Sequence, residues 1–378
     1  MVSRDELSYR EVYDPIPQAF AERDSVGVEH LLLRSAQLGA SDVHLKAGSP
    51  PALRIDGELI LQRDLPHLKP EEIELMLKGL TTEEQWLAFE KNLELDFSYS
   101  LPGVARFRVN AGRQRESVTL VARRLSLTIP TLDELGLPAV CKELASKPRG
   151  LILVTGPTGS GKSTTMAAMI DYINEREARR VITIEDPIEY VFEDRRCVIT
   201  QRELGIDTHS FAEALKHALR QDPDVILVGE MRDLETIATA LTAAETGHLV
   251  LSTVHTASAA LTVDRIIDVF PPHQQQQIRT QLAGIVEGVL CQTLLPLASG
   301  KGRTLAMEIM IATSAVRNLI REGKTHQLTG VIETGARVGM QTLDQALVKI
   351  FKEGKITLDE ALAKAGNPGH LRHLIEAM

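Results

Sequence analysis

Apolar and polar residues alternate in several short stretches between residues 27 and 125. The alternation surrounds Asp56-Gly57, and an Asp-Gly pair in that setting predicts a β-hairpin. Residues 70–92 show helical spacing and predict two helices, with Thr82 and Gln85 placed as a capping box for the second. We expect a small α+β domain here, completed by three further alternating strands at residues 93–100, 104–111 and 118–125.

From about residue 141 the pattern changes to apolar runs separated by segments of helical spacing. The runs are short and rich in β-branched residues, as in strands of a parallel sheet that is buried on both faces. This alternation predicts a doubly wound α/β domain, which binds ligands at the carboxyl ends of its strands. The predicted strands lie at 151–154, 181–184, 225–228 and 249–254, and helices at 164–176, 211–220 and 234–246.

Two further segments flank these domains. Residues 1–26 are charged, contain Pro15 and Pro17, and show no clear period, so we interpret them as an N-terminal extension. Residues 126–140 contain Pro130 and Pro138 and are interpreted as a linker. The predicted order is therefore extension 1–26, α+β domain 27–125, linker 126–140 and α/β domain 141–378.

A phosphate-binding loop follows the first apolar run of the α/β domain. Residues 156–163 fit the pattern G-x-x-x-x-G-K-[ST], between a predicted strand and a predicted helix. Its glycines let backbone N–H groups converge on phosphate, and the helix N-terminus adds partial positive charge. Lys162 is expected to reach the β- and γ-phosphates, and the Ser163 hydroxyl to hold Mg²⁺. The predicted triphosphate-binding set is Gly156, Pro157, Thr158, Gly159, Ser160, Gly161, Lys162, Ser163 and Thr164.

Three other polar clusters follow predicted strands of the same sheet. Glu185-Asp186-Pro187-Ile188-Glu189 follows residues 181–184, Gly229-Glu230-Met231-Arg232-Asp233 follows residues 225–228, and His255 follows residues 249–254. Taken singly, such residues are usually solvated or structural. Together they fall at one edge of one sheet, where phosphoryl transfer needs positioned charge.

We expect a carboxylate of these clusters to polarise water or to bind Mg²⁺. The candidate catalytic residues are Glu189, Glu230, His255 and Lys162. The candidate Mg²⁺ ligands are Ser163, Glu230 and Asp186. His255 is placed where it could sense a γ-phosphate.

Arginines crowd two predicted strands of the α+β domain. Alternation puts Arg106 and Arg108 on one strand face. Two interpretations remain open: a solvated basic face, or arginines that bind the phosphates of a triphosphate held by a neighbouring domain or subunit. Arg106, Arg108 and Arg123 are carried as candidate nucleotide-binding residues, from the set Arg106, Arg108, Arg113, Arg115, Arg123 and Arg124.

Composition limits the class of protein. The chain has 378 residues and a net charge of −9, from 42 basic and 51 acidic residues, which disfavours nonspecific nucleic-acid binding. Its three cysteines are far apart, so neither a zinc site nor a disulfide framework is expected. The N-terminus does not resemble a signal peptide, and no apolar stretch approaches the roughly 20 residues that span a bilayer. We expect a cytoplasmic protein that meets a membrane only through a partner.

These motifs resemble the type II/IV secretion ATPase superfamily and, within it, the retraction ATPases of type IV pili. The resemblance covers about residues 28–365. It includes the phosphate loop, the acidic clusters and the His255 segment, together with Ala40-Ser41-Asp42-Val43-His44-Leu45, Arg106-Phe107-Arg108-Val109-Asn110, Thr246-Gly247-His248 and Ala315-Val316-Arg317-Asn318-Leu319-Ile320-Arg321-Glu322. The last segment is similar to one characteristic of retraction motors.

The resemblance implies a PAS-like N-terminal domain, a RecA-like P-loop ATPase domain and a homohexameric ring. It implies Mg²⁺-dependent ATP hydrolysis, with arginines of the small domain completing the site. It further implies action on an inner-membrane pilus platform protein, so that the chain is peripheral at that membrane, with a retraction ATPase paralogue as a further partner. Pilus retraction and twitching motility would follow. Glu189 is favoured as base and Glu230 for Mg²⁺, although the sequence leaves this order open.

Other functions fit the sequence less well. Pilus-assembly and type II secretion ATPases share the nucleotide site, but commonly carry a four-cysteine zinc insertion and a longer N-terminal domain. A paralogue that only assists retraction, a weakly hydrolysing signalling module and a nucleic-acid motor fit less well. The segment 315–322, with Arg317 and Arg321 expected to be exposed, is a candidate platform-binding surface or else an amphipathic core helix.

Overall fold

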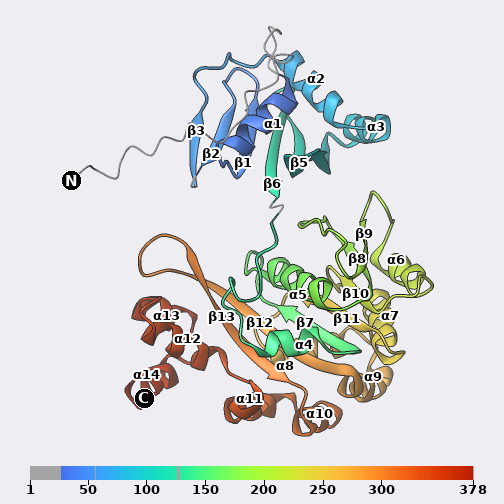
Figure 1. Ribbon diagram of the computed structural model, residues 1–378, viewed down its shortest axis with the longest axis vertical. Helices are drawn as coiled ribbons and strands as arrows, with labels where there is room; N and C mark the ends of the chain where they lie inside the picture. The colour runs from blue at the N-terminus through green and yellow to red at the C-terminus, as the bar shows by residue number, and fades with distance from the viewer. Residues whose placement is uncertain (1–26, 56, 126–127, 378) are drawn as a thin grey trace. The chain divides into compact units, whose positions relative to one another are not determined.

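The computed structural model describes residues 27–55, 57–125 and 128–377, and the chain divides into two compact units between residues 126 and 127 (Figure 1). The predicted extension 1–26 lies outside the described residues. Within them, no helix combines the length and the hydropathy that a bilayer crossing requires.

The first unit is an antiparallel six-stranded sheet with three helices. The strand order is β3-β2-β1-β6-β5-β4. The helices are α1 (Val28–Gln37), α2 (Pro70–Leu80) and α3 (Glu83–Asn92). The strands are β1 (Asp42–Lys46), β2 (Ala52–Ile55), β3 (Glu58–Leu61), β4 (Glu94–Leu101), β5 (Ala105–Gln114) and β6 (Ser117–Leu125).

Local signals position these elements much as the sequence predicts. Strands β2 and β3 pair with Ile55 opposite Glu58, so the predicted hairpin is present, although Asp56 itself is not among the described residues. The capping box of α3 is also confirmed. The Thr82 hydroxyl accepts a hydrogen bond from the Gln85 amide at 3.2 Å, and the Gln85 side chain accepts one from the Thr82 amide at 3.0 Å.

The helices of the first unit cover one face of its sheet. Side chains from all three helices pack with alternate residues of the strands, as with Phe89 of α3 and Phe107 of β5, both fully buried. Arg106 and Arg108 flank Phe107 and therefore lie on the opposite face, as predicted. This face, which we call the arginine face, also carries Arg123, because Arg123 of β6 pairs with Arg108 of β5.

The second unit is built on a mixed seven-stranded sheet. The strand order is β13-β12-β7-β11-β10-β8-β9, parallel from β12 to β9, with β13 antiparallel to β12. The strands are β7 (Gly150–Thr155), β8 (Arg180–Glu185), β9 (Val198–Glu203), β10 (Val225–Val228), β11 (Leu249–Val254), β12 (Val286–Pro296) and β13 (Arg303–Ile311). The four predicted strands are thus confirmed, while β9, β12 and β13 were not predicted.

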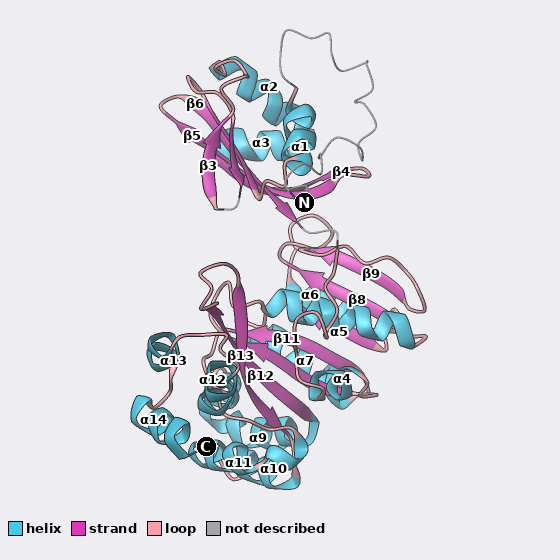
Figure 2. Ribbon diagram, turned by 60° about the vertical axis from the view of Figure 1, so that its left-hand side comes forward, coloured by secondary structure: helices cyan, strands magenta, loops and turns pink. Residues whose placement is uncertain are grey.

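Helices cover both faces of this sheet, which confirms the α/β class (Figure 2). On one face, α4 (Val140–Ala145) and α5 (Lys162–Arg176) pack on Ile152 and Val154 of the central strand. On the other, Leu151 and Leu153 meet a larger helical layer. That layer consists of α6 (Phe211–Ala218), α7 (Leu234–Glu245), α8 (Ala259–Asp268) and α9 (Pro272–Ile285).

The segment predicted as a linker is packed rather than extended. Leu132 and Leu137 are buried in the same cluster as α4 and α5. The chain therefore joins the second unit's core well before residue 140.

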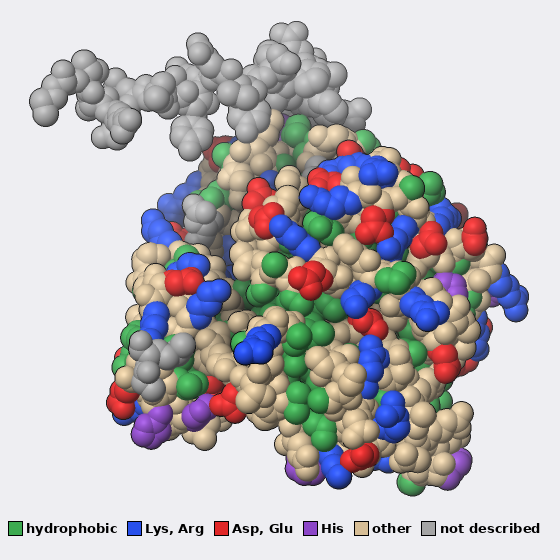
Figure 3. All heavy atoms as spheres, turned by 60° about the horizontal axis from the view of Figure 1, so that its bottom comes forward, with side chains coloured by type: hydrophobic (Ala, Val, Ile, Leu, Met, Phe, Trp, Pro, Cys, Tyr) green, Lys and Arg blue, Asp and Glu red, His purple; other side chains and the backbone are tan. Residues whose placement is uncertain are grey.

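The C-terminal helices follow the β12–β13 hairpin. They are α10 (Ser314–Arg321), α11 (Leu328–Thr334), α12 (Leu343–Lys352), α13 (Leu358–Lys364) and α14 (Pro368–Ala377). Leu295 of β12 packs with Leu347 of α12 in a separate small core. On the face drawn in Figure 3, acidic and basic side chains are interspersed and form no extended patch of one sign.

The expectation that Arg317 is exposed is wrong. Its side chain is only 23% exposed, because it binds the carbonyls that end α9 and the carboxylate of Glu287. Arg321 is exposed as expected, and Val316 and Ile320 are buried, so α10 is an amphipathic helix docked on the core.

Candidate active site

The phosphate-binding loop connects β7 to α5 and fits closely against β12. Gly156 has φ of 137°, and a Cβ there would lie 2.4 Å from the carbonyl oxygen of Gln292 and 2.7 Å from the Ser160 hydroxyl. Gly161 caps α5 with φ of 88°. The first N–H groups of α5 have no acceptor within the helix, so they face the loop. These residues therefore form a concave cluster of donors that suits phosphate.

Lys162 is the first residue of α5, and its side chain reaches back to the start of this loop. Its ammonium donates to the carbonyl oxygens of Gly156 and Pro157, at 3.0 Å each, and the residue is 8% exposed. Burial lowers the pKa of Lys162 below its ordinary value, while the carboxylates of Glu230 and Glu189 oppose that shift. Both predicted catalytic glutamates thus act electrostatically on the predicted catalytic lysine.

Neighbouring strands hold Glu230 in place. The Gly229 amide donates to the carbonyl of Ile184 at 2.8 Å, and the Thr253 hydroxyl donates to the carbonyl of Gly229 at 2.7 Å. A Cβ on Gly229 would lie 3.2 Å from the same Ile184 carbonyl, so a larger residue would crowd the strand. The chain therefore leaves β10 through a glycine that is bonded on both sides, and Glu230 emerges at the sheet edge.

An arginine and a histidine flank the Glu230 carboxylate. Its Oε1 lies 3.2 Å from Nε2 of His255 and 2.5 Å from Nε of Arg232. Burial alone would raise the pKa of Glu230, but Arg232 and His255 together hold it below its ordinary value. Glu230 is consequently an anion at neutral pH, as a metal ligand or a base requires.

The acidic cluster after β8 contains both structural and available carboxylates. Glu185 accepts hydrogen bonds from Thr183 at 2.6 Å and Gln201 at 3.1 Å, and burial raises its pKa. Asp186 and Glu189 are exposed. The Tyr190 hydroxyl lies 3.0 Å from that of Thr164, which places this loop beside the first turn of α5.

Most predicted site residues of the second unit therefore gather at one sheet edge, around Lys162 and Glu230. Asp233 has a different role: its carboxylate caps α7 by accepting from the Thr236 amide at 2.8 Å. Among the described residues, no group of three or more His, Cys, Asp or Glu side chains has the spacing of a metal site. Ser163, which the sequence nominates for Mg²⁺, is half-buried at the start of α5.

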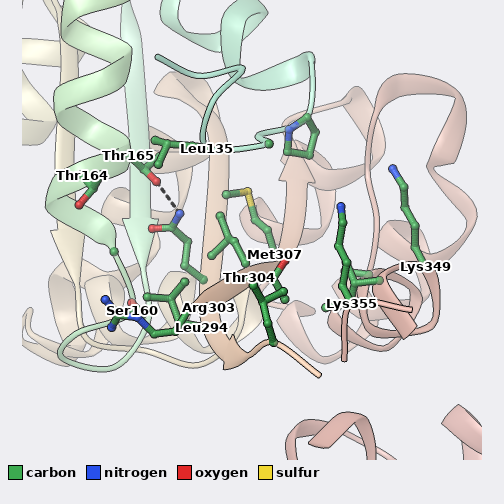
Figure 4. Close-up of a pocket in the computed structure, with 18 of the residues that line it drawn as sticks. Leu135, Ser160, Thr164, Thr165, Leu294, Arg303, Thr304, Met307, Lys349 and Lys355 are labelled. Carbon is green, nitrogen blue, oxygen red and sulfur yellow. Dashed lines mark hydrogen bonds between the residues drawn. The ribbon is translucent and has the colours of Figure 1, made fainter. Parts of the chain in front are cut away.

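A cavity of about 700 Å³ opens beside the loop, and no sequence pattern predicted it (Figure 4). Ser160, Thr164 and Thr165 line one side, and Lys349 and Lys355 lie across from them. Its apolar lining comes from the segment before α4 and from the β12–β13 hairpin, including Leu135, Leu294 and Met307. The hairpin was not predicted, and so its wall was missed.

Gln292 joins this hairpin to the loop. Its side-chain amide donates to the Thr165 hydroxyl at 2.6 Å, which is the dashed line in Figure 4. Gln292 is 1% exposed and Thr165 is 2% exposed. Because the Gln292 carbonyl also abuts Gly156, strand β12 holds both the loop and the first turn of α5.

The arginine face of the first unit is only partly free for a ligand. Nε of Arg123 donates to Oδ1 of Asp42 at 2.8 Å, and Asp42 is 5% exposed as a side chain. Arg108 is exposed, whereas Arg106 is half-buried and hydrogen-bonds to Ser100 at 3.5 Å. Of the three predicted nucleotide-binding arginines, Arg123 therefore already has an anionic partner.

The chain is similar to known proteins along most of its length. Residues 36–363 match the family model described as type II/IV secretion system protein. The type IV pilus retraction ATPase PilT of Pseudomonas aeruginosa is 50% identical over 341 residues, with 90% of this chain and 98% of that protein covered. A twitching motility protein of Neisseria gonorrhoeae is 50% identical over 317 residues, with 84% of each chain covered. The solved structure of a pilus retraction motor PilT with bound ADP has a TM-score of 0.87 and 49% identity, covering 92% of this chain and 100% of that one.

Proposed function

The chain belongs to the type II/IV secretion system protein family, and we propose that it is an ATP-hydrolysing motor of that family which retracts a type IV pilus. One observation carries the catalytic part: the phosphate-loop lysine, Lys162, lies in the electrostatic field of two carboxylates, Glu189 and Glu230, at one sheet edge. Retraction is proposed because two relatives that are 50% identical are named for pilus retraction and twitching motility.

In this proposal the loop holds the phosphates of ATP. Lys162 exchanges its two backbone carbonyl partners for the β- and γ-phosphates, and the N–H groups of α5 bind the same oxygens. The cavity beside the loop accommodates the nucleoside, because Leu135, Leu294 and Met307 offer an apolar wall. We assign nucleotide binding on the arginine face to Arg106, Arg108 and Arg123.

Ser163, Glu230 and Asp186 would hold Mg²⁺, since hydroxyl and carboxylate oxygens are the ligands it prefers. When bound, the ion would neutralise charge on the phosphates. Glu189 is exposed and is assigned as the base that orients water. His255 lies 3.2 Å from Glu230 and holds that carboxylate in place.

The assembly proposed is a homohexamer in the cytoplasm, peripheral at the inner membrane through a pilus platform protein. A PAS-like first unit and a RecA-like second unit fit the two sheets described above. Light scattering of the purified chain with ATP and Mg²⁺ should give the mass of six copies, and a monomer at micromolar protein would contradict the ring.

Steady-state ATP hydrolysis tests the site. Lys162→Ala and Glu230→Ala should each lower kcat at least 100-fold, because positioned charge supplies much of the rate in phosphoryl transfer, on the order of 10²–10³ per donor. Glu245→Ala is the matched control, because Glu245 ends α7 and lines a separate cavity with Arg149 and Gly150 at the start of β7. Wild-type turnover in either site variant would contradict the assignment.

Two glutamine variants separate the proposed roles of the glutamates. Glu189→Gln should abolish single-turnover hydrolysis and leave Mg²⁺-dependent nucleotide binding intact. Glu230→Gln should make nucleotide binding less dependent on Mg²⁺. The reverse pattern would exchange the two assignments.

A deletion strain tests retraction. We expect long, unretracted pili and loss of twitching, restored by the wild-type chain and not by Lys162→Ala. Normal retraction in the deletion strain would refute this role. Loss of pili altogether would favour a pilus-assembly ATPase instead.

A further inference from the structure

Arg232 is a charged residue at the active-site edge to which neither the motifs nor the proposed function gives a role. It follows Glu230 by two positions, and its Nε lies 2.5 Å from Glu230 Oε1. Its side chain is 75% exposed, whereas that of Glu230 is 18% exposed. The guanidinium is therefore largely solvated, whereas the carboxylate that it contacts is largely buried.

Arg232 is suited to exchange its contact with Glu230 for a contact with another anion. An ion pair with one partner so exposed is screened by water and is weak. A guanidinium carries five N–H donors in a planar fork that matches phosphate. Among the described contacts Arg232 uses Nε alone, on Glu230, which leaves both Nη groups for another acceptor.

The surroundings of Arg232 define where such an acceptor would lie. Glu230 contacts Arg232 and His255 and acts electrostatically on Lys162, and Asp186 acts on Arg232 in the same way. Lys162 of a phosphate loop reaches the β- and γ-phosphates. A terminal phosphate held by Lys162 would thus lie at the same sheet edge as the carboxylate that Arg232 already contacts.

We propose that Arg232 binds the γ-phosphate of ATP held on the same chain, leaving Glu230 to do so. With ADP there is no γ-phosphate, and Arg232 stays on Glu230. The residue would thereby distinguish ATP from ADP at the site and place a cation where charge develops during hydrolysis. This inference rests on the proposed binding of ATP at the phosphate loop.

Equilibrium binding without turnover tests the proposal. Titration calorimetry with Mg²⁺ would compare ADP with AMP-PNP, a non-hydrolysable ATP analogue, on wild type, Arg232→Gln and Arg232→Lys. The glutamine variant should bind AMP-PNP about 10-fold more weakly and ADP unchanged, a loss of about 1.4 kcal/mol. The lysine variant should recover part of the AMP-PNP affinity, because it keeps the charge and loses the fork.

Arg372→Gln on α14 is the control, since Arg372 is an exposed arginine on a C-terminal helix and does not line the cavity beside the loop. Equal weakening of ADP and AMP-PNP in Arg232→Gln, or no change in either, would overturn the proposal. If wild type binds neither nucleotide, the proposed function itself fails, which distinguishes the two cases. An unchanged melting temperature in Arg232→Gln would exclude misfolding as the cause.

Discussion

Removal of the Arg317 side chain should destabilise the second unit and leave the first unaffected. The guanidinium donates to the carbonyls of Ala312, Ala283 and Gly284 at 3.0, 2.8 and 2.9 Å, and to Glu287 at 2.7 Å. Arg317→Ala leaves three backbone acceptors without this donor, two at the end of α9 and one just after β13. Arginine near a helix C-terminus also favours the helix dipole, and that contribution is lost too.

The expected magnitude follows from these contacts. Three hydrogen bonds at about 1 kcal/mol each, plus roughly 1 kcal/mol for a partly buried ion pair, total about 4 kcal/mol. Water replaces part of this, because the Arg317 side chain is 23% exposed. We therefore expect a loss of about 2–4 kcal/mol in the free energy of unfolding. For a unit of this size that corresponds to roughly 5–12 °C in melting temperature.

The assay uses the single tryptophan of the chain, Trp86, which lies in α3 of the first unit. Its fluorescence follows that unit, while calorimetry and circular dichroism follow both. Arg317→Ala should lower the transition of the second unit and leave the Trp86 transition unchanged. Arg321→Ala, four residues along on the exposed side of α10, should change stability by less than about 0.5 kcal/mol. Equal effects of the two substitutions would refute the reasoning.

Gly156→Ala should weaken ADP binding at least 10-fold in calorimetry, because the new Cβ would meet the Gln292 carbonyl at 2.4 Å; Gly205→Ala, with φ of 82° and open space around it, is the control for backbone strain alone. Equal binding by the two variants would show that this contact is not decisive. Asp42 controls acid stability of the first unit: burial raises its pKa, but hydrogen bonds from Ser41 and Arg123 and the charge of Arg123 hold it below the ordinary 3.8. A carboxyl whose pKa is lower in the folded than in the unfolded state stabilises the fold above its unfolded pKa, and this stabilisation is lost as the pH falls through the folded pKa. Trp86 fluorescence should therefore show acid unfolding below about pH 4, and Asp42→Asn should make that transition less steep. If the variant unfolds in acid with the same steepness as wild type, other carboxylates are responsible for the acid unfolding.

The edge of the parallel sheet could be predicted because strand ends are local signals. A β-branched run that stops before Gly229 predicts that Glu230 lies at the carboxyl end of a strand, and this prediction does not depend on the rest of the chain. The β12–β13 hairpin lacked such a signal, because polar Gln292 and Thr293 interrupt its apolar run. Because the hairpin was not predicted, the cavity wall that it forms and the contact of Gln292 with Thr165 were not predicted either.

Arg317 and the predicted linker show a second limit. A long charged side chain on an amphipathic helix is usually solvated, and only the tertiary position of α9 and Glu287 gives Arg317 its partners. Leu132 and Leu137 were surrounded by prolines and polar residues in sequence, yet the surface of α4 and α5 buries them. The periodicity of the sequence predicts neither the burial of Arg317 nor that of the two leucines, because both depend on which distant segments pack against them.

The two carbonyls that hold Lys162 bear on how the site empties. A buried ammonium without partners is costly, so a lysine stranded by departing phosphate would retain the product. Here the carbonyls of Gly156 and Pro157 accept hydrogen bonds from the Lys162 ammonium at 3.0 Å, so the charged group keeps polar partners. In the proposed cycle, release of ADP would exchange the phosphate partners of Lys162 for these two carbonyls, so the backbone of the loop would lower the barrier to emptying the site.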